Sequence, residues 1–118
     1  MATALAQLGQ AEFSDGELDA ARDAYVESRA LFEGIDDSSR AAQVDIRLAR
    51  IDVEDNDLVS AQERVDKVLT LTLREALHEP AIEAMELAGD IAIRQGDPAG
   101  AIDAYERTIR HIDETGFV

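Results

Sequence analysis

The chain has 118 residues, the size of one ordinary domain, and its hydrophobic content of 46% is enough for a packed core. It contains no cysteine, which excludes a disulfide scaffold, a zinc–thiolate site and thiol catalysis. With 26 acidic and 11 basic residues the net charge is −15, so we expect no binding to nucleic acid or to anionic membrane surfaces.

The apolar residues recur at spacings of three and four, which predicts helices and gives no strand signal. In chain order, six helices are expected at about 2–14, 17–33, 38–54, 57–74, 80–95 and 98–114. Gly16, Asn56 and Gly96 fall in the turns between them, since these residue types tolerate a left-handed backbone. The acidic residue after each of the three can cap the following helix, and Pro98 suits a first helical turn.

A repeat of 40 residues organises these helices, because Ala21, Ala61 and Ala101 are 40 residues apart and the positions around them agree without a gap. The matching columns hold Gly9, Ala49 and Gly89; Tyr25, Val65 and Tyr105; and Ser28, Val68 and Thr108. Short turns make neighbouring helices antiparallel, and similar units stack on one another. The expected fold is therefore an all-α solenoid of three antiparallel helix pairs, in one domain over residues 1–118 with repeats at about 1–36, 37–76 and 77–116.

The residues in these columns resemble tetratricopeptide repeats over the whole chain. The resemblance rests on Leu5-x-x-Leu8-Gly9, Gly16, Ala21, Tyr25 and Ser28, and on Gly89, Gly96, Ala101, Tyr105 and Thr108. The second repeat follows mainly by register, the period is 40 rather than about 34, and Glu12, Asp52 and Ala92 stand where the family usually has an aromatic residue. The resemblance implies a right-handed superhelix that serves as a protein–protein interaction module and not as an enzyme.

A second resemblance gives an alternative function. Residues 30–37 are similar to the longer repeats in sensor regions of large bacterial regulatory ATPases. That similarity implies a self-assembly or regulatory sensor segment of a larger bacterial signalling ATPase or transcription regulator.

The first helix of each pair carries a polar row between two apolar flanks. In residues 38–54 this row is Gln43, Arg47, Arg50 and Glu54, a pattern that indicates a helix packed on both sides with one face open. In tetratricopeptide repeat proteins this face lines a concave groove that accepts peptides. The resemblance therefore implies that a protein or peptide partner is faced by Gln7, Gln10, Gln43, Arg47, Arg50, Asp90 and Arg94.

Two of these arginines have different expected surroundings. Arg50 and Asp90 share one column, so Arg50 either faces the ligand or pairs with Asp90 on the neighbouring repeat. Arg47 has no acidic residue in its column and is the better candidate to hold a carboxylate of the partner. The Lys and Asn residues of the family's two-carboxylate clamp are absent, so a chaperone-type acidic C-terminus is not an expected ligand.

The sequence gives no sign of catalysis, of a cofactor or of a metal site. It has no Gly-rich phosphate loop and no dinucleotide-binding motif. Glu75-x-x-His78 is half of a di-iron carboxylate motif whose second half is missing at His111. We interpret His78 as a residue at a repeat boundary and expect His111 on the outside of the last helix.

Both ends of the array look cut rather than capped. Phe117 and Val118 fall in register with the start of another first helix, and Met1 falls in register with Ala41. Ile109 and Ile112 are then expected to be partly exposed. We expect either a segment of a longer array or a two-fold homodimer that covers an uncapped end. The longest uncharged run, residues 1–11, is too short to span a bilayer and lacks the basic flank of a signal peptide, so a cytoplasmic location is expected.

Overall fold

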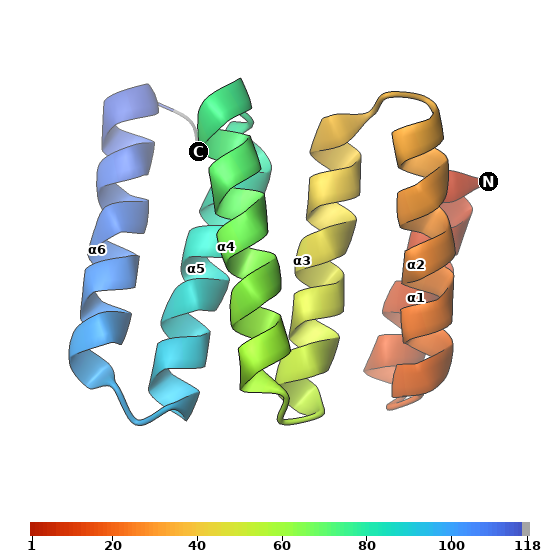
Figure 1. Cartoon of the computed structure of the whole chain (residues 1–118), viewed down its shortest axis with the longest axis horizontal. Coiled ribbons are helices and arrows are strands. Elements are labelled where there is room, and N and C mark those ends of the chain that lie inside the picture. The colour runs from red at the N-terminus through yellow and green to blue at the C-terminus, as the bar shows by residue number, and fades with distance from the viewer. Residues whose placement is uncertain (117–118) are drawn as a thin grey trace.

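The computed structural model describes residues 1–116, and in these residues every regular element is an α-helix (Figure 1). The helices are α1 Ala2–Ser14, α2 Leu18–Gly34, α3 Ser38–Glu54, α4 Leu58–Glu75, α5 His78–Arg94 and α6 Pro98–Thr115. The predicted all-α class and the three antiparallel helix pairs are confirmed. Phe117 and Val118, on which part of the argument about the ends rests, lie outside the described residues.

The turn inside each pair has the predicted left-handed residue. The φ angles of Gly16, Asn56 and Gly96 are 80°, 60° and 73°. The carboxylates of Asp57 and Asp97 each accept a hydrogen bond from the backbone N–H three residues on, at 3.2 and 2.9 Å. Glu17, at the same position before α2, makes no such bond, in line with the preference for shorter side chains at a helix N-cap.

The turns between pairs also contain a left-handed residue, Asp36 before α3 and Ala76 before α5. Helix α5 begins at His78, two residues earlier than the predicted start at Pro80. The first N–H groups of a helix have no partner within it, so a proline in the first turn removes no hydrogen bond. Pro80 therefore lies inside the first turn of α5 and does not mark its beginning.

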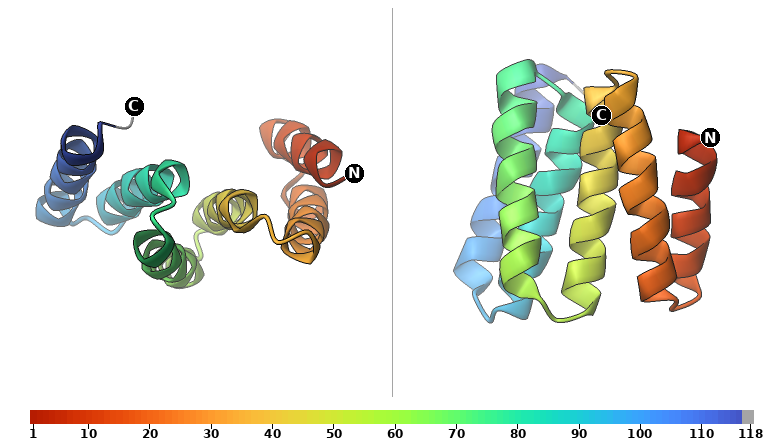
Figure 2. Two further views of the ribbon diagram at one scale, coloured as in Figure 1. Left: turned by 90° about the horizontal axis from the view of Figure 1, so that it is seen from above. Right: turned by 45° about the vertical axis from the view of Figure 1, so that its right-hand side comes forward.

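The six helices form a curved row with extents of 37 × 30 × 21 Å (Figure 2). Seen from above, α1, α3 and α5 lie along the inner side of the curve and α2 and α4 along the outer side. The core runs along both sides of α3, whose Ile46, Leu48 and Ile51 are completely enclosed. The concave side of the curve is therefore built from the first helix of each pair.

Close contact within two of the helix pairs depends on a glycine opposite a tyrosine. A Cβ atom on Gly9 would lie 3.0 Å from the Tyr25 ring, and one on Gly89 would overlap the Tyr105 ring. In the middle pair, Val65 is the smaller residue in the tyrosine column and Ala49 stands where the glycines are. In each pair, the smaller residue of one column thus stands opposite the larger residue of the other.

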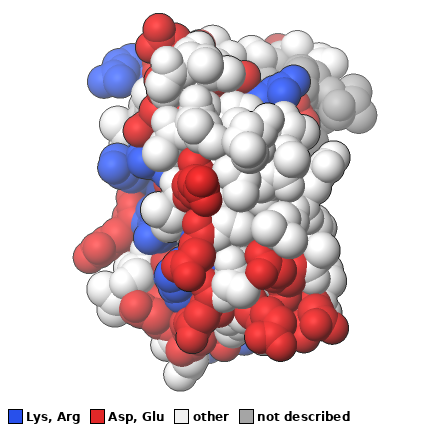
Figure 3. Space-filling model, turned by 90° about the vertical axis from the view of Figure 1, so that its right-hand side faces the viewer, with Lys and Arg blue, Asp and Glu red and all other residues white. Residues whose placement is uncertain are grey.

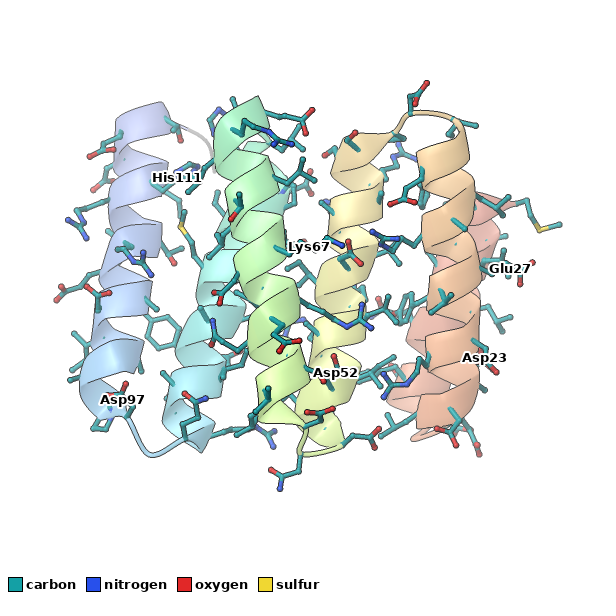
Figure 4. The ribbon with its side chains drawn as sticks, in the orientation of Figure 1. Asp23, Glu27, Asp52, Lys67, Asp97 and His111 are labelled. Carbon is teal, nitrogen blue, oxygen red and sulfur yellow. The ribbon has the colours of Figure 1, made fainter. Side chains whose placement is uncertain are left out.

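On the outer side, a buried carboxylate ties three helices together (Figure 4). The Asp52 side chain on α3 is only 4% exposed and accepts hydrogen bonds from Arg22 of α2 at 2.8 Å and from Arg64 of α4 at 2.9 Å. Two turns earlier, Asp45 pairs with Arg29 of α2 at 2.6 Å. Asp52 stands in the column where the family usually has an aromatic residue, and there it forms an ionic link between α2, α3 and α4.

Candidate peptide groove

All seven residues predicted to face a partner lie along the concave side, where three hollows adjoin. The first, about 600 Å³, is lined by Gln7, Gln10, Gln43 and Arg47 among others. The second, about 270 Å³, shares Gln10 and Arg47 with the first and adds Arg50. The third, about 360 Å³, shares Arg50 with the second and adds Asp90 and Arg94. Because each hollow shares a residue with the next, the polar row forms one continuous groove across α1, α3 and α5.

The first hollow opens between α1 and α3. Helix α1 packs against α2, but its backbone stays further from α3 than that of α5 does. The apolar floor of this hollow is made by Tyr25 and Phe32 of α2 and by Val44 of α3, each of which is at most 5% exposed. The sequence assigned these three residues to packing between helices. The separation of α1 from α3, which makes them a floor, leaves no pattern in the sequence.

Arg47 has an acidic neighbour that its column did not predict. Its Nη2 atom lies 3.9 Å from Oε1 of Glu83 on α5. Glu83 belongs to the column of Gln43, one helical turn away, and reaches Arg47 from the next repeat. A separation of 3.9 Å is near the outer limit of an ion pair, and the role of Arg47 in holding a carboxylate of the partner stays a prediction.

Arg50 is instead the unpaired cation of the groove. Among residues 1–116 it makes no hydrogen bond and no ion pair. The alternative of an Arg50–Asp90 pair does not occur in these residues, and Asp90 instead accepts a hydrogen bond of 2.6 Å from the Tyr105 hydroxyl. That bond raises the pKa of Tyr105. The half-buried guanidinium of Arg50 thus lies at the junction of two hollows with its donors unused.

Glu83 is the second incompletely satisfied group. Its Oε2 atom is buried and finds no hydrogen-bond donor within the described part of the chain. Burial raises the pKa of the Glu83 carboxyl, and the positive charges of Arg47 and Arg50 oppose that rise. At the far end of the groove Arg94 pairs with Glu54 at 3.1 Å and so is less available to a ligand. The half of the groove near α1 therefore offers more free polar groups.

Two charged residues that were not predicted, Arg40 and Glu79, also line the first hollow. Within residues 1–116 the Arg40 side chain makes one ion pair, a contact of 3.5 Å to Asp37. Arg40 precedes Gln43 and Arg47 by whole helical turns, so extending the polar row by one turn would have found it.

The two histidines come together away from the groove. Nδ1 of His78 and Nε2 of His111 are 3.2 Å apart, so one ring donates a hydrogen bond to the other. His111 therefore faces α5 (Figure 4), and the expectation that it lies on the outside of the last helix is wrong. No group of three or more potential metal ligands occurs in residues 1–116. None of the helices described is both long and apolar enough to cross a membrane.

Stacked antiparallel helix pairs with a groove along their first helices define a helical-repeat protein of the interaction-module class. The sequence model of the tetratricopeptide repeat-like domain family matches residues 2–117, and the chain belongs to this family. No curated protein sequence matches the chain. Members of this family generally act as protein–protein interaction modules and are typically not enzymes.

Proposed function

We propose that the concave face of α1, α3 and α5 binds an extended or helical segment of a partner protein and catalyses no reaction. The observation that carries this proposal is the unpaired guanidinium of Arg50 in the middle of a continuous groove. A planar guanidinium offers paired donors that match a carboxylate. In a chain with net charge −15, an arginine that makes no hydrogen bond and no ion pair within the described residues is available to bind a ligand.

The rest of the groove defines the ligand more closely. Gln7, Gln10 and Gln43 carry amides that both donate and accept hydrogen bonds, which suits a peptide backbone. The apolar floor beside them can accept an aliphatic or aromatic side chain. We therefore expect a segment with an acidic residue near Arg50 and a large apolar residue one or two positions away, lying over the gap between α1 and α3.

Long-range repulsion limits how acidic the partner can be. The protein repels any anion at a distance, but this field falls off within about 8 Å at physiological salt. The contact at Arg50 is short-ranged and partly shielded from water. A ligand with one or two carboxylates is therefore favoured over a run of acidic residues, and its affinity is expected to hold or rise when salt is added.

The test is a selection of short random peptides on the immobilised protein, followed by calorimetric titration of the selected sequences. We expect enrichment of Asp or Glu beside an apolar residue. Arg50→Glu is expected to weaken binding by about tenfold or more, which corresponds to about 1.4 kcal/mol. Arg107→Glu on α6 is the matched control, since it makes the same charge change at an exposed site outside the three hollows.

The melting temperature separates recognition from structure. If Arg50→Glu weakens binding while melting at the temperature of the unmodified protein, Arg50 recognises the ligand. An equal loss of binding in Arg107→Glu, or selected peptides that ignore the change at Arg50, would contradict the proposal.

Some expectations from the sequence stay predictions. These are the role as a regulatory sensor segment of a larger bacterial signalling ATPase or transcription regulator, the cytoplasmic location and the place of the chain within a longer array.

A further inference from the structure

The outer side of the array carries a second groove, which lies between α2 and α4. Both helices pack against α3 and hardly against each other, so α3 forms the floor of the gap between them (Figure 2). Two hollows of about 470 and 500 Å³ occupy this gap and share Arg29, Asp45 and Lys67. Because the walls and the floor belong to the middle of the array, further repeats at either end would extend it without covering this groove.

The exposed isoleucine at the α6 end lies away from this groove. Ile109 is 59% exposed and Ile112 is half-buried, as expected from the sequence. The two-fold homodimer through an uncapped end stays a prediction.

Basic side chains gather in the outer groove although the chain as a whole is acidic. Figure 3 views the array from its α1–α2 end and shows them along the left edge, where the outer side is seen in profile. Arg29, Arg64, Lys67 and Arg74 line the two hollows, four of the 11 basic residues in a chain of net charge −15. Lys67, the one lysine of the chain, lies where the hollows meet, between α4 and α3 (Figure 4).

In the larger hollow the acidic groups are already paired and two of the cations are not. Glu33 and Asp45 both form ion pairs with Arg29, at 2.9 and 2.6 Å. Lys67 and Arg74 on the opposite wall make no hydrogen bond and no ion pair within the described part of the chain. This hollow therefore offers two positive charges that no carboxylate of the protein compensates.

The spacing of these residues along α4 defines the shape of a ligand. Lys67, Leu71 and Arg74 are four and three residues apart, so they lie on one face of α4, and all three line the larger hollow. Half-buried Leu71 adjoins the apolar part of the floor, made by Ala41 and Ala42. The wall therefore presents a cation, an apolar side chain and a second cation over a length of about 10 Å.

The pair of cations has no counterpart in the other two repeats. The positions of Lys67 and Arg74 are held by Glu27 and Gly34 in the first repeat and by Arg107 and Glu114 in the third. The stacking of helix pairs therefore does not require these two cations, and a ligand is a reason for their presence that packing does not provide.

We propose that this groove binds an amphipathic helix of a partner protein, with two carboxylates seven residues apart and an apolar residue between them. A helix that lies alongside α4 has the same rise per residue, so its two carboxylates meet Lys67 and Arg74 together while its apolar residue contacts Leu71. The net charge of −15 does not prevent this contact, because its field falls off within about 8 Å at physiological salt. The site lies on the opposite side of the array from the concave groove and binds independently of it.

The test uses short synthetic helices as probes. A fluorescein-labelled, alanine-based peptide of about 18 residues, long enough to form a helix, carries two glutamates at the proposed spacing with leucine between them. One control peptide has its glutamates on opposite sides of the helix, another has lysines in their place, and a third has a central proline that prevents the helix. Fluorescence anisotropy is expected to show binding of the first peptide that is at least about tenfold tighter than that of any control. Equal affinity of a control peptide, or no binding at millimolar protein, would overturn the proposal.

Charge reversals locate the peptide on the protein. Lys67→Glu is expected to weaken binding by about tenfold or more. Arg107→Glu is the matched control, because it makes the same charge change in the same column on α6, and it should alter the affinity by less than about twofold. Arg50→Glu on the concave side should have equally little effect. A loss with Arg107→Glu as large as that with Lys67→Glu, or a loss with Arg50→Glu, would overturn the proposal.

The single lysine gives a readout of the contact itself. A carbodiimide joins the Lys67 amine to a glutamate of the bound peptide as an amide with loss of water, and the only other amine is at the amino terminus. With an acetylated peptide that lacks lysine, mass spectrometry is expected to find the cross-link at Lys67. Lys67→Arg should bind the peptide without forming this cross-link. A cross-link at the amino terminus alone, or none, would overturn the proposal.

Discussion

The packing of Gly89 against Tyr105 leads to a quantitative prediction. In Gly89→Ala the new methyl group overlaps the tyrosine ring, so the ring must move and its 2.6 Å hydrogen bond to Asp90 is lost or weakened. Overpacking of this kind costs about 1–3 kcal/mol. Alanine regains about 1 kcal/mol over glycine inside a helix, and the exposed hydrogen bond is worth at most about 1 kcal/mol. Together these contributions give a net loss of unfolding free energy between about 0 and 3 kcal/mol, with a central value of about 1.5 kcal/mol.

The chain supplies the compensating change, because the middle repeat already combines Ala49 with Val65. Tyr105→Val alone removes ring packing, but Tyr105→Val together with Gly89→Ala reproduces the middle pair. The loss of unfolding free energy in the double variant is expected to be about 1 kcal/mol smaller than the sum of the losses in the two single variants. Urea denaturation of the four proteins of this cycle gives the coupling energy.

Gly34→Ala is the control, since a Cβ atom at Gly34 meets nothing within 4 Å. Its stability is expected to change little. If Gly89→Ala were as stable as Gly34→Ala, or if the two changes in the cycle were simply additive, the argument that the glycine sets the separation of the helices would be wrong.

Three other predictions concern charge. Asp52→Asn should lower the unfolding free energy by about 1–3 kcal/mol, because Arg22 and Arg64 lose a shared buried partner. The control Asp55→Asn, at an exposed site, should change it by less than about 0.5 kcal/mol, and urea denaturation measures both. Glu83→Gln should stabilise the protein at neutral pH, because burial raises the pKa of the Glu83 carboxyl in the folded state and so disfavours its charged form above that pKa. Melting curves should show that the gain in stability shrinks as the pH falls through the folded-state pKa. A gain that does not depend on pH would refute this explanation. The melting temperature should rise from low to molar sodium chloride, since salt screens the repulsion within a chain of net charge −15, and a flat profile would mean that the charges are already locally paired.

The sequence predicts the backbone well because each helix pair repeats the same local signals. Gly16, Asn56 and Gly96 mark the turns, and the 40-residue register aligns the helices. The one helix end that was predicted more than one residue away is the start of α5, which we placed at Pro80. The helix begins at His78, because a proline is tolerated throughout the first turn of a helix.

The sequence could predict which residues line the groove, but not which of their side chains pair with one another. Periodicity shows which side of α3 is open, and so it found Arg47 and Arg50. Whether each arginine is paired depends on how far the Glu83 side chain reaches from the next repeat and on the conformations of the Arg50 and Asp90 side chains. These contacts depend on side-chain conformations, which leave no period in the sequence.

The central claim is that Arg50 recognises an acidic residue of a partner segment, and a reciprocal charge change tests it most directly. The best selected peptide and a variant with lysine in place of its acidic residue are each titrated into the unmodified protein and into Arg50→Glu. We expect tight binding only for the two combinations of opposite charge, with an affinity about tenfold or more above that of the other two. If the lysine peptide bound Arg50→Glu no better than it binds the unmodified protein, the acidic residue would not lie against Arg50 and the account would be contradicted.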